Sequence, residues 1–300
     1  MKLLLLLFQL ALCLDTNYEQ QWLLECDPKH AGLLSRLAEE GDLVEHLDLW
    51  TEHPSNSLMV RVDKTGFDNL ANLECRKMRL TGHAAIRKAL LQRPTGSSEC
   101  LDFCPPPVFY SSYRSYDEIL GRMDRIEGVR TEVIGKSHEG RDIKIARKGN
   151  PLGAKIWICA GQHAREWISP MTAMYLIEHL TDEKILEGFD VVVLSIANPD
   201  GYVFSQVVDR MWRKNRRPIV YLGRTVYGVD LNRNWDNWWG GAGTSRDPRS
   251  QVYAGEGPAS EPEVKAIQDF VLGLEKRVFG IDLHSFGQFI LRVYGKECLC

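Results

Sequence analysis

The sequence predicts an α/β fold in which a mixed, mostly parallel sheet is covered by helices on both faces. Two apolar runs carry this prediction: residues 155–160 indicate a short buried strand, and residues 190–196 form a β-branched run typical of a strand covered on both faces. The amphipathic segment 171–180 between them predicts a helix. Alternation of strands with helices favours parallel pairing, because the helix carries the chain back across the sheet.

The rest of this part of the chain follows the same alternation. Residues 116–126 predict a helix and residues 278–284 predict a further strand. The Ser-Glu-Pro-Glu sequence at 260–263 matches a capping box, and it precedes an apolar helical pattern. We therefore expect this sheet fold to extend from about Tyr110 onward.

A smaller α+β unit is predicted for the segment that comes before. Asp27 and Pro28 supply an N-cap residue and a first-turn proline for a helix that continues through Leu37. Residues 57–62 indicate a strand, and residues 66–73 indicate a second helix. This segment contains enough apolar residues for a core of its own.

Proline, glycine and serine interrupt the pattern between the two parts. Pro94, Gly96 and the Pro105-Pro106-Pro107 run are typical of a linker or of a surface strap between domains. The boundaries that we predict are a first domain at residues 14–95, a linker at 96–108 and a second domain at 109–300.

The first residues of the chain are typical of an export signal. Met1-Lys2 is followed by a leucine-rich apolar stretch that ends at Leu14, and small residues stand near Cys13. We predict a signal peptide at residues 1–13, and hence a secreted, extracellular protein. A buried N-terminal helix or strand is the alternative.

Charge and hydropathy exclude some classes of partner. The formal net charge of −3 gives no electrostatic reason to expect nucleic acid or an anionic membrane. Outside the N-terminal stretch, the chain has no apolar run long enough to span a bilayer. We expect no nucleic acid partner and no membrane span.

Seven of the eight cysteines would remain after cleavage behind Cys13. An odd number in a secreted chain leaves at least one thiol free or intermolecular. Cys159 lies inside an apolar run, which favours a buried and unreactive thiol. The pairing of the other cysteines cannot be derived from the sequence.

Metal-ligating residues stand at the ends of two predicted strands. His163 and Glu166 follow the strand at 155–160 and are three residues apart, so in a tight turn both can reach one ion. His284 ends the strand at 278–284. Sites in open α/β sheets form at the carboxyl ends of strands. Two histidines and one carboxylate leave a fourth position open, which is the catalytic form of a site for one Zn²⁺.

The His-x-x-Glu spacing alone is weak evidence for a metal site. His179 has a similar spacing to Asp182, but it lies at a predicted helix end and is expected to cap that helix or face solvent. His138 is followed by Glu139 in a polar loop and is expected at the surface.

Five sequence blocks accompany His163 and carry a family resemblance. They are His-Ala-Arg-Glu-Trp-Ile at 163–168, Asn-Pro-Asp-Gly-Tyr at 198–202, Arg-Met-Trp-Arg-Lys at 210–214, Gly-Val-Asp-Leu-Asn-Arg-Asn-Trp at 228–235 and His-Ser at 284–285. In this order they resemble the zinc carboxypeptidases of the pancreatic A/B type. The resemblance covers residues 110–295 and, more loosely, the preceding segment, which is similar to that family's inhibitory propeptide. It implies a carboxypeptidase-like fold behind a small ferredoxin-like propeptide domain.

The resemblance implies a role for each matched residue. His163, Glu166 and His284 correspond to the zinc ligands, and Asp230 to a carboxylate that orients His163. The other matched residues concern the substrate. Asn232 and Arg233 correspond to the clamp on the terminal carboxylate, Arg213 to the residue that stabilises the oxyanion, and Arg165 and Arg210 to auxiliary substrate-binding arginines.

The sequence also departs from the family pattern. Phe286 stands where these enzymes commonly carry tyrosine, and Val226 and Arg249 stand where many relatives have a disulfide. The resemblance places the general-base glutamate and the specificity pocket downstream of the second histidine, and this sequence has 16 residues after His284. We therefore expect a carboxypeptidase fold that is incomplete at its C-terminal side, a truncated form of the family's catalytic domain.

The expected function is that of a zinc-dependent exopeptidase precursor. Its substrates would be the C-termini of peptides or proteins, an activating protease would remove the propeptide, and the chain would be a monomer. Two alternatives stay open: a secreted, non-catalytic protein that binds zinc and peptide C-termini, and a folded propeptide that inhibits an active relative.

Overall fold

The computed structural model describes residues 22–39, 43–49, 58–70, 73, 75–77, 106–285 and 290–291. The signal peptide predicted at residues 1–13 lies outside the described residues, as do residues 96–105 of the predicted linker. The last three residues predicted as linker begin a short helix, α6 (Pro106–Phe109). Within the described ranges, the structure contains no helix long and apolar enough to cross a membrane.

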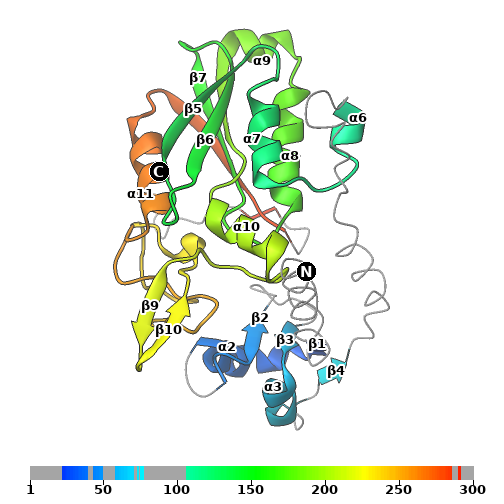
Figure 1. Ribbon diagram of the computed structural model, residues 1–300, viewed down its shortest axis with the longest axis vertical. Coiled ribbons are helices and arrows are strands. Elements are labelled where there is room, and N and C mark those ends of the chain that lie inside the picture. The colour runs from blue at the N-terminus through cyan, green and yellow to red at the C-terminus, as the bar shows by residue number, and fades with distance from the viewer. Residues whose placement is uncertain are drawn as a thin grey trace, which may run out of the picture.

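A five-stranded sheet forms the centre of the larger part of the molecule (Figure 1). Its strands lie in the order β11-β7-β8-β6-β5, with β5 at Val129–Lys136, β6 at Asp142–Gly149, β7 at Ala154–Ala160, β8 at Phe189–Leu194 and β11 at Arg277–Leu283. β7 pairs in parallel with β8 and β11, whereas β6 pairs antiparallel with β8 and β5. Among these five strands only β6 runs in the reverse direction, so the predicted mixed and mostly parallel sheet is confirmed.

Helices cover both faces of this sheet (Figure 1). Alternate residues of β8 face opposite cores, because successive side chains of a strand point to opposite faces. Val191 and Val193 lie in the core under α7 (Tyr116–Met123) and α8 (Ile168–Glu178), whereas Val192 and Leu194 lie in the core under α11 (Pro262–Gly273). The remaining elements of this part are α9 (Glu183–Gly188), α10 (Pro199–Val207) and the 3₁₀ turn η2 (Leu231–Arg233).

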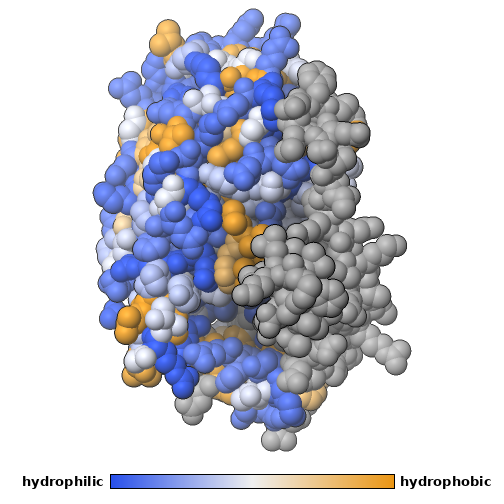
Figure 2. All heavy atoms as spheres, viewed as in Figure 1, coloured by the Kyte–Doolittle hydropathy of each residue, from blue (hydrophilic) through white to orange (hydrophobic). Residues whose placement is uncertain are grey.

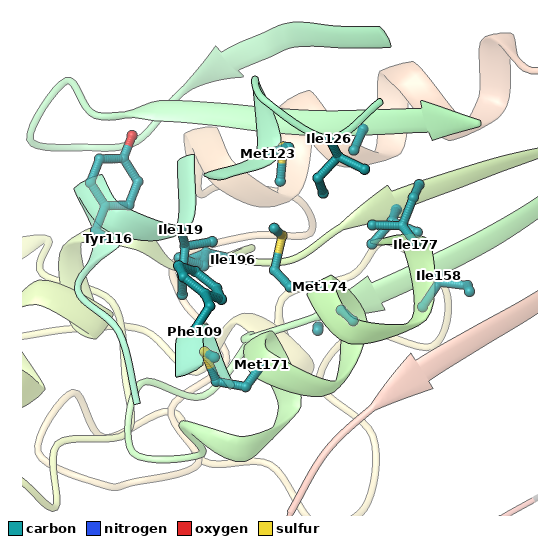
Figure 3. Packing of buried hydrophobic residues seen from close by; sticks show 14 of the residues in the cluster. Phe109, Tyr116, Ile119, Met123, Ile126, Ile158, Met171, Met174, Ile177 and Ile196 are labelled. Carbon is teal, nitrogen blue, oxygen red and sulfur yellow. The ribbon is translucent and has the colours of Figure 1, made fainter. Parts of the chain in front are cut away.

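The core between the sheet and the pair α7 and α8 is closely packed (Figure 3). Ile119 and Met123 of α7 and Met174 of α8 each have 0% of their surface exposed. Phe109 of α6 and Ile158 of β7 also belong to this cluster. Burial of one such side chain contributes about 1.5–3 kcal/mol, so this core is a main source of stability for the sheet that carries the site.

The capping box expected at residues 260–263 is wrong. The N-cap of α11 is Glu261, which makes no side-chain cap hydrogen bond. The Ser260 hydroxyl instead donates to the Glu261 carboxylate at 2.8 Å and accepts from the Asn234 amide at 2.9 Å. Because Pro262 takes the first helical position, the helix begins one residue later than the serine would require. A capping box does form at α7, between Ser115 and Glu118.

The N-terminal part is a small α+β unit with the predicted ferredoxin-like topology. Its elements follow one another as β1 (Trp22–Cys26), η1 (Pro28–His30), α2 (Ala31–Glu39), β2 (Leu47–Leu49), β3 (Leu58–Val62), α3 (Lys64–Asn69) and β4 (Cys75–Lys77). The strands lie in the order β2-β3-β1-β4, and every pair is antiparallel. This succession and order define the split βαβ arrangement.

Three cysteines lie within the described residues. Cys26 and Cys75, which are directly opposite each other on β1 and β4, form a disulfide. The sequence had left this pairing open. Cys159 on β7 is a free and buried cysteine, as predicted.

A two-stranded hairpin projects from the larger part (Figure 1). It consists of β9 (Pro218–Tyr221) and β10 (Arg224–Tyr227). Figure 2 shows a mainly hydrophilic surface with apolar spheres in the region of this hairpin, where Val220 and Leu222 are 80% and 81% exposed.

Candidate metal centre

The pairing of two parallel strands brings His163 and His284 to the same edge of the sheet. Leu283 of β11 is in register with Ala160 of β7, and His284 follows Leu283 directly. His163 comes three residues after Ala160, in the loop that leads to α8. Both histidines therefore stand where the strands end, as the position of a site in an open α/β sheet requires.

The loop after β7 is shaped by Gly161. This residue has a φ of +69°, and a Cβ atom there would lie 3.0 Å from the Ser195 carbonyl oxygen. The chain then turns back, since the Glu166 amide donates to the His163 carbonyl at 3.2 Å. This turn directs the side chains of His163 and Glu166 toward one point.

The three predicted ligands meet in a compact cluster. His163 Nδ1 lies 2.7 Å from Glu166 Oε1, and His284 Nδ1 lies 3.0 Å from Glu166 Oε2. The two Nδ1 atoms are 3.1 Å apart. One ligand atom from each residue lies within 4.8 Å of the others, and no other such cluster of His, Cys, Asp or Glu is found among the described residues. The convergence expected from the sequence is thus present.

A carboxylate supports His163 on its outer side. Asp230 Oδ1 lies 3.1 Å from His163 Nε2 and accepts from the Asn232 amide at 3.0 Å. Its other oxygen accepts from Arg213 Nε and Nη2 at 3.2 and 2.9 Å. Asp230 is fully buried and paired with a guanidinium, so its charge is compensated. Asp230 thus contacts the ring nitrogen of His163 that is not directed at Glu166.

A second carboxylate, which the sequence analysis missed, supports His284. Asp282 Oδ2 lies 3.0 Å from His284 Nε2 and also accepts a hydrogen bond from the Gln162 amide. The spacing of Asp282 and His284 was a usable signal, because residues two apart on a strand lie on the same face. The Cys159 thiol also contacts this carboxylate, and burial together with Asp282 raises the pKa of the thiol.

The pKa shifts describe a centre that is built to hold positive charge. Burial works against ionisation of Glu166 and Asp230. Even so, the pKa of both carboxyls lies well below the usual range, because His163 lowers that of Glu166 and Arg213 lowers that of Asp230. Burial would lower the pKa of His284, but hydrogen bonds to Asp282 and Glu166 outweigh it and raise the pKa to about 10. The cluster therefore keeps its carboxylates ionised and favours a cation beside them.

The donor set fits a divalent zinc ion. When Nε2 of each histidine donates to its carboxylate, both Nδ1 atoms carry lone pairs that face the Glu166 carboxylate. Two imidazole nitrogens and one carboxylate are the protein ligands of a catalytic zinc site with one open position. His163, Glu166 and His284 are thus able to hold one Zn²⁺.

The predicted substrate-binding residues lie on the segments that carry His163 and Asp230, or are hydrogen-bonded to one of them. Asn232 and Arg233 lie on η2, directly after Asp230, and Arg233 Nε donates to the Gly243 carbonyl at 2.9 Å. Arg210 Nη1 donates to the Arg165 carbonyl at 2.7 Å. The structure joins these arginines to the loops of the site, and their roles toward a substrate remain predictions.

Two neighbours of these arginines were not predicted. The Arg210 guanidinium lies 3.6 Å from the centroid of the Trp167 ring, a stacking distance that fixes the arginine against the loop after β7. Lys214 follows Arg213 and is buried, and its Nζ donates to the Pro248 carbonyl at 2.6 Å. Burial lowers the pKa of Lys214 to about 7.

Similarity to known proteins identifies the family of this chain. The sequence profile of the zinc carboxypeptidase family matches residues 122–299. The chain belongs to the zinc carboxypeptidase family. Members of this family use one zinc ion, which is the ion that the cluster of His163, Glu166 and His284 fits.

Two relatives match this chain at moderate identity. A metallocarboxypeptidase A-like protein of Trichophyton verrucosum is 39% identical in an alignment of 209 residues that covers 64% of this chain and 49% of that protein. Carboxypeptidase A2 of Mus musculus is 39% identical over 204 residues, covering 63% of this chain and 48% of the relative. The chain thus spans about half the length of the curated relatives it matches.

Solved structures support the fold. Carboxypeptidase A from Helicoverpa armigera matches with a TM-score of 0.77 at 24% identity, over 89% of this chain and 70% of that one. Thrombin-activatable fibrinolysis inhibitor matches with a TM-score of 0.67 at 25% identity, over 89% of this chain and 72% of that one. The fold predicted from the sequence is that of carboxypeptidases.

Proposed function

We propose that this chain belongs to a zinc-dependent exopeptidase that removes C-terminal residues from peptides and proteins. The observation that carries the proposal is the convergence of His163 Nδ1, His284 Nδ1 and the Glu166 carboxylate, with a carboxylate behind each imidazole. Such a centre directs two imidazole nitrogens and one carboxylate to one point, which is the donor set of a catalytic zinc site.

Each residue of the centre has a separate task. Zinc held there supplies a Lewis acid that polarises a carbonyl and lowers the pKa of water. Asp230 keeps the His163 ring in one orientation, and Arg213 compensates the charge of Asp230 while lying beside the centre. We propose that Arg213 also stabilises the developing oxyanion, for which a buried guanidinium is suited.

Recognition of a chain end requires a carboxylate-binding group near the zinc. Asn232 and Arg233 fit this requirement, since η2 follows Asp230 and Asp230 contacts His163. A guanidinium binds a carboxylate through two parallel hydrogen bonds. We propose that Asn232 and Arg233 bind the terminal carboxylate of the substrate, with Arg165 and Arg210 as auxiliary contacts.

The N-terminal unit supports a precursor role. We propose that residues 14–95 form an inhibitory propeptide, that 109–300 belong to the catalytic domain, and that an activating protease cuts between them. We further propose a secreted monomer that is exported by a signal peptide at residues 1–13. The disulfide between Cys26 and Cys75 favours this compartment, because disulfides form and persist in oxidising environments.

Zinc binding provides the first test, with the full chain and zinc as the probe. We expect one zinc per chain, and we expect His163→Ala to weaken binding by more than the ~10–100-fold typical of residues that only support a ligand. His179→Ala is the matched control, since His179 is the exposed C-cap of α8. Equal zinc affinity of parent and His163→Ala would overturn the proposal.

Hydrolysis provides the second test. Because the resemblance places the general-base glutamate downstream of His284, hydrolysis of a blocked dipeptide with a free terminal carboxylate should be ~10²–10⁴-fold slower without that residue. The C-terminal amide of the same dipeptide should not be hydrolysed. Hydrolysis of both compounds would contradict a carboxylate clamp. Binding of the free dipeptide without any turnover would overturn the enzymatic function and favour a non-catalytic binder of peptide C-termini.

A further inference from the structure

Asp282 is the second carboxylate of the centre, and it lies two residues before His284. Asp282 belongs to β11 and His284 directly follows the last residue of this strand, so in an extended chain their side chains share a face. Asp282 Oδ2 lies 3.0 Å from His284 Nε2, on the side of the ring that points away from His163 and Glu166. Asp282 therefore lies outside the cluster of ligand atoms and contacts it through His284.

The side chains of Gln162 and Cys159 contact Asp282, and Trp235 holds Gln162 in place. The Gln162 amide nitrogen donates to Asp282 Oδ2, and the Trp235 indole N–H donates to Gln162 Oε1 at 3.0 Å. The amide orientation of Gln162 is thus determined from both ends, because the indole can only donate and a carboxylate can only accept. Trp235, Gln162, Asp282 and His284 form one relay across three separate segments of the chain.

The geometry points to Asp282 as a positioning residue for His284. A carboxylate at Nε2 selects the imidazole tautomer that carries its proton there and leaves Nδ1 free to bind a metal. Asp230 acts in the same way on His163. We infer that Asp282, held by Gln162 and Trp235, orients His284 and raises the zinc affinity of the centre. This inference rests on the proposed role of His284 as a zinc ligand.

The two supporting carboxylates differ in exposure, and this sets the expected size of the effect. The side chains of His284 and Asp282 are 30% and 39% exposed, whereas those of His163 and Asp230 are 2% and 0% exposed. Water competes for an exposed hydrogen bond and screens its charge. Loss of the Asp282 contact should therefore cost zinc affinity near the lower end of the ~10–100-fold range known for such residues.

The test compares zinc affinities of full-length variants by competition with a chelator. Asp282→Asn keeps the shape of the side chain but removes its charge, and its amide can turn an N–H toward His284 and favour the wrong tautomer. We expect an approximately tenfold higher Kd for zinc. Asp269→Asn is the matched control, because Asp269 is an exposed carboxylate on α11 that pairs with Lys265.

A spectroscopic measurement separates positioning from stability alone. The visible spectrum of bound Co²⁺ reports the ligand geometry, so it should change in Asp282→Asn and remain unchanged in Asp269→Asn. Gln162→Leu should weaken zinc binding less than Asp282→Asn does, and it should add nothing in the double variant, because Gln162 acts through Asp282. Thermal unfolding of the metal-free proteins would identify a loss of fold.

The outcomes are distinct. Unchanged zinc affinity and an unchanged Co²⁺ spectrum in Asp282→Asn would overturn the positioning role, and additive effects of the two substitutions would overturn the relay. If His163→Ala and His284→Ala lose zinc while Asp282→Asn binds like the parent, the metal site stands and the inference fails. If His284→Ala retains the parental affinity, the proposed ligand set itself is wrong.

Discussion

At the scale of single residues, Glu263 is a buried carboxyl that lies away from the metal centre. Its side chain is fully buried at the start of α11 and accepts from the His138 amide at 3.1 Å. Burial, together with the charges of Glu261 and Asp200, raises the pKa of Glu263 to about 7, from 4.5. The folded state thus binds a proton there more tightly than the unfolded state does.

This shift makes stability depend on pH. A carboxyl with a raised folded-state pKa stabilises fully below the unfolded value of 4.5, and this contribution is lost as the pH rises through about 7. The loss amounts to about 3 kcal/mol, since each pKa unit corresponds to about 1.4 kcal/mol. We expect Glu263→Gln to remove this dependence. In urea unfolding, the free energy of unfolding of the variant should therefore rise relative to that of the parent between pH 4.5 and 8.

Glu275→Gln is the control for this measurement, because Glu275 is exposed just after α11. Its stability should follow that of the parent at every pH. A constant difference between Glu263→Gln and the parent over the whole range would show that the pKa of Glu263 is the same in the folded and unfolded states.

At the scale of elements, the loop after β7 depends on the conformation of Gly161. Alanine at this position must adopt a φ of +69°, which costs about 1–2 kcal/mol, and its Cβ would lie 3.0 Å from the Ser195 carbonyl oxygen. Because His163 follows two residues later, relief of this contact must move the ligand. We expect Gly161→Ala to lower both the melting temperature and the zinc affinity.

Gly223 at the tip of the β9–β10 hairpin offers the matched comparison. Its φ is +74°, and a Cβ there would have no atom within 4 Å. Gly223→Ala should therefore lose stability through backbone strain alone and bind zinc like the parent. Equal zinc affinities of the two alanine variants would mean that the Gly161 loop adapts without moving His163.

The central strands could be predicted from the sequence, whereas two other strands could not. β7 and β8 are apolar along most of their length, and this reflects a position that is covered on both faces. β5 has no buried residue at all, and β6 carries charges such as Lys144 and Arg147 that pair with Asp124 and Asp190. A strand whose polar residues find partners elsewhere in the chain lacks the apolar pattern that sequence reasoning depends on.

The same division applies to the candidate site. His163 and Glu166 are close in sequence, so their convergence follows from local geometry. The proximity of His284 to them could be predicted because the carboxyl ends of parallel strands lie at the same edge of a sheet. The contact between Gln162 and Trp235 spans 73 residues, and the one between Gln162 and Asp282 spans 120. Such contacts depend on how the loops pack, which no spacing rule encodes.

At the scale of the whole molecule, two serines connect the N-terminal unit to the loop beside the site. Ser250 Oγ donates to the Ala38 carbonyl at 2.9 Å, and Ser245 Oγ donates to the Glu39 carbonyl. Ala38 and Glu39 end α2, and the last carbonyls of a helix have no partner within it. The two hydroxyls therefore act as a cap that is supplied from the other part of the chain.

This cap adjoins a residue of the proposed substrate clamp. Ser245 lies two residues after Gly243, whose carbonyl accepts from Arg233 Nε at 2.9 Å. Both serines are buried, with 2% and 0% of their surface exposed. The nearby pair of Arg249 and Glu45, at 3.9 Å, is partly exposed and contributes little. Docking of α2 on this loop thus depends mainly on the hydrogen bonds of the two serine hydroxyls and on the burial of the two serines.

We expect the double variant Ser245→Ala, Ser250→Ala to release α2 more often. Each hydrogen bond contributes about 1 kcal/mol net, so loss of both should favour the undocked state by about 2 kcal/mol, or roughly 30-fold. Hydrogen exchange of the amides at 245–252 measures this, because undocking exposes the segment. Ser111→Ala, which removes an exposed local hydrogen bond to Val108, should exchange like the parent. Parental exchange rates in the double variant would show that other contacts hold α2 against the loop.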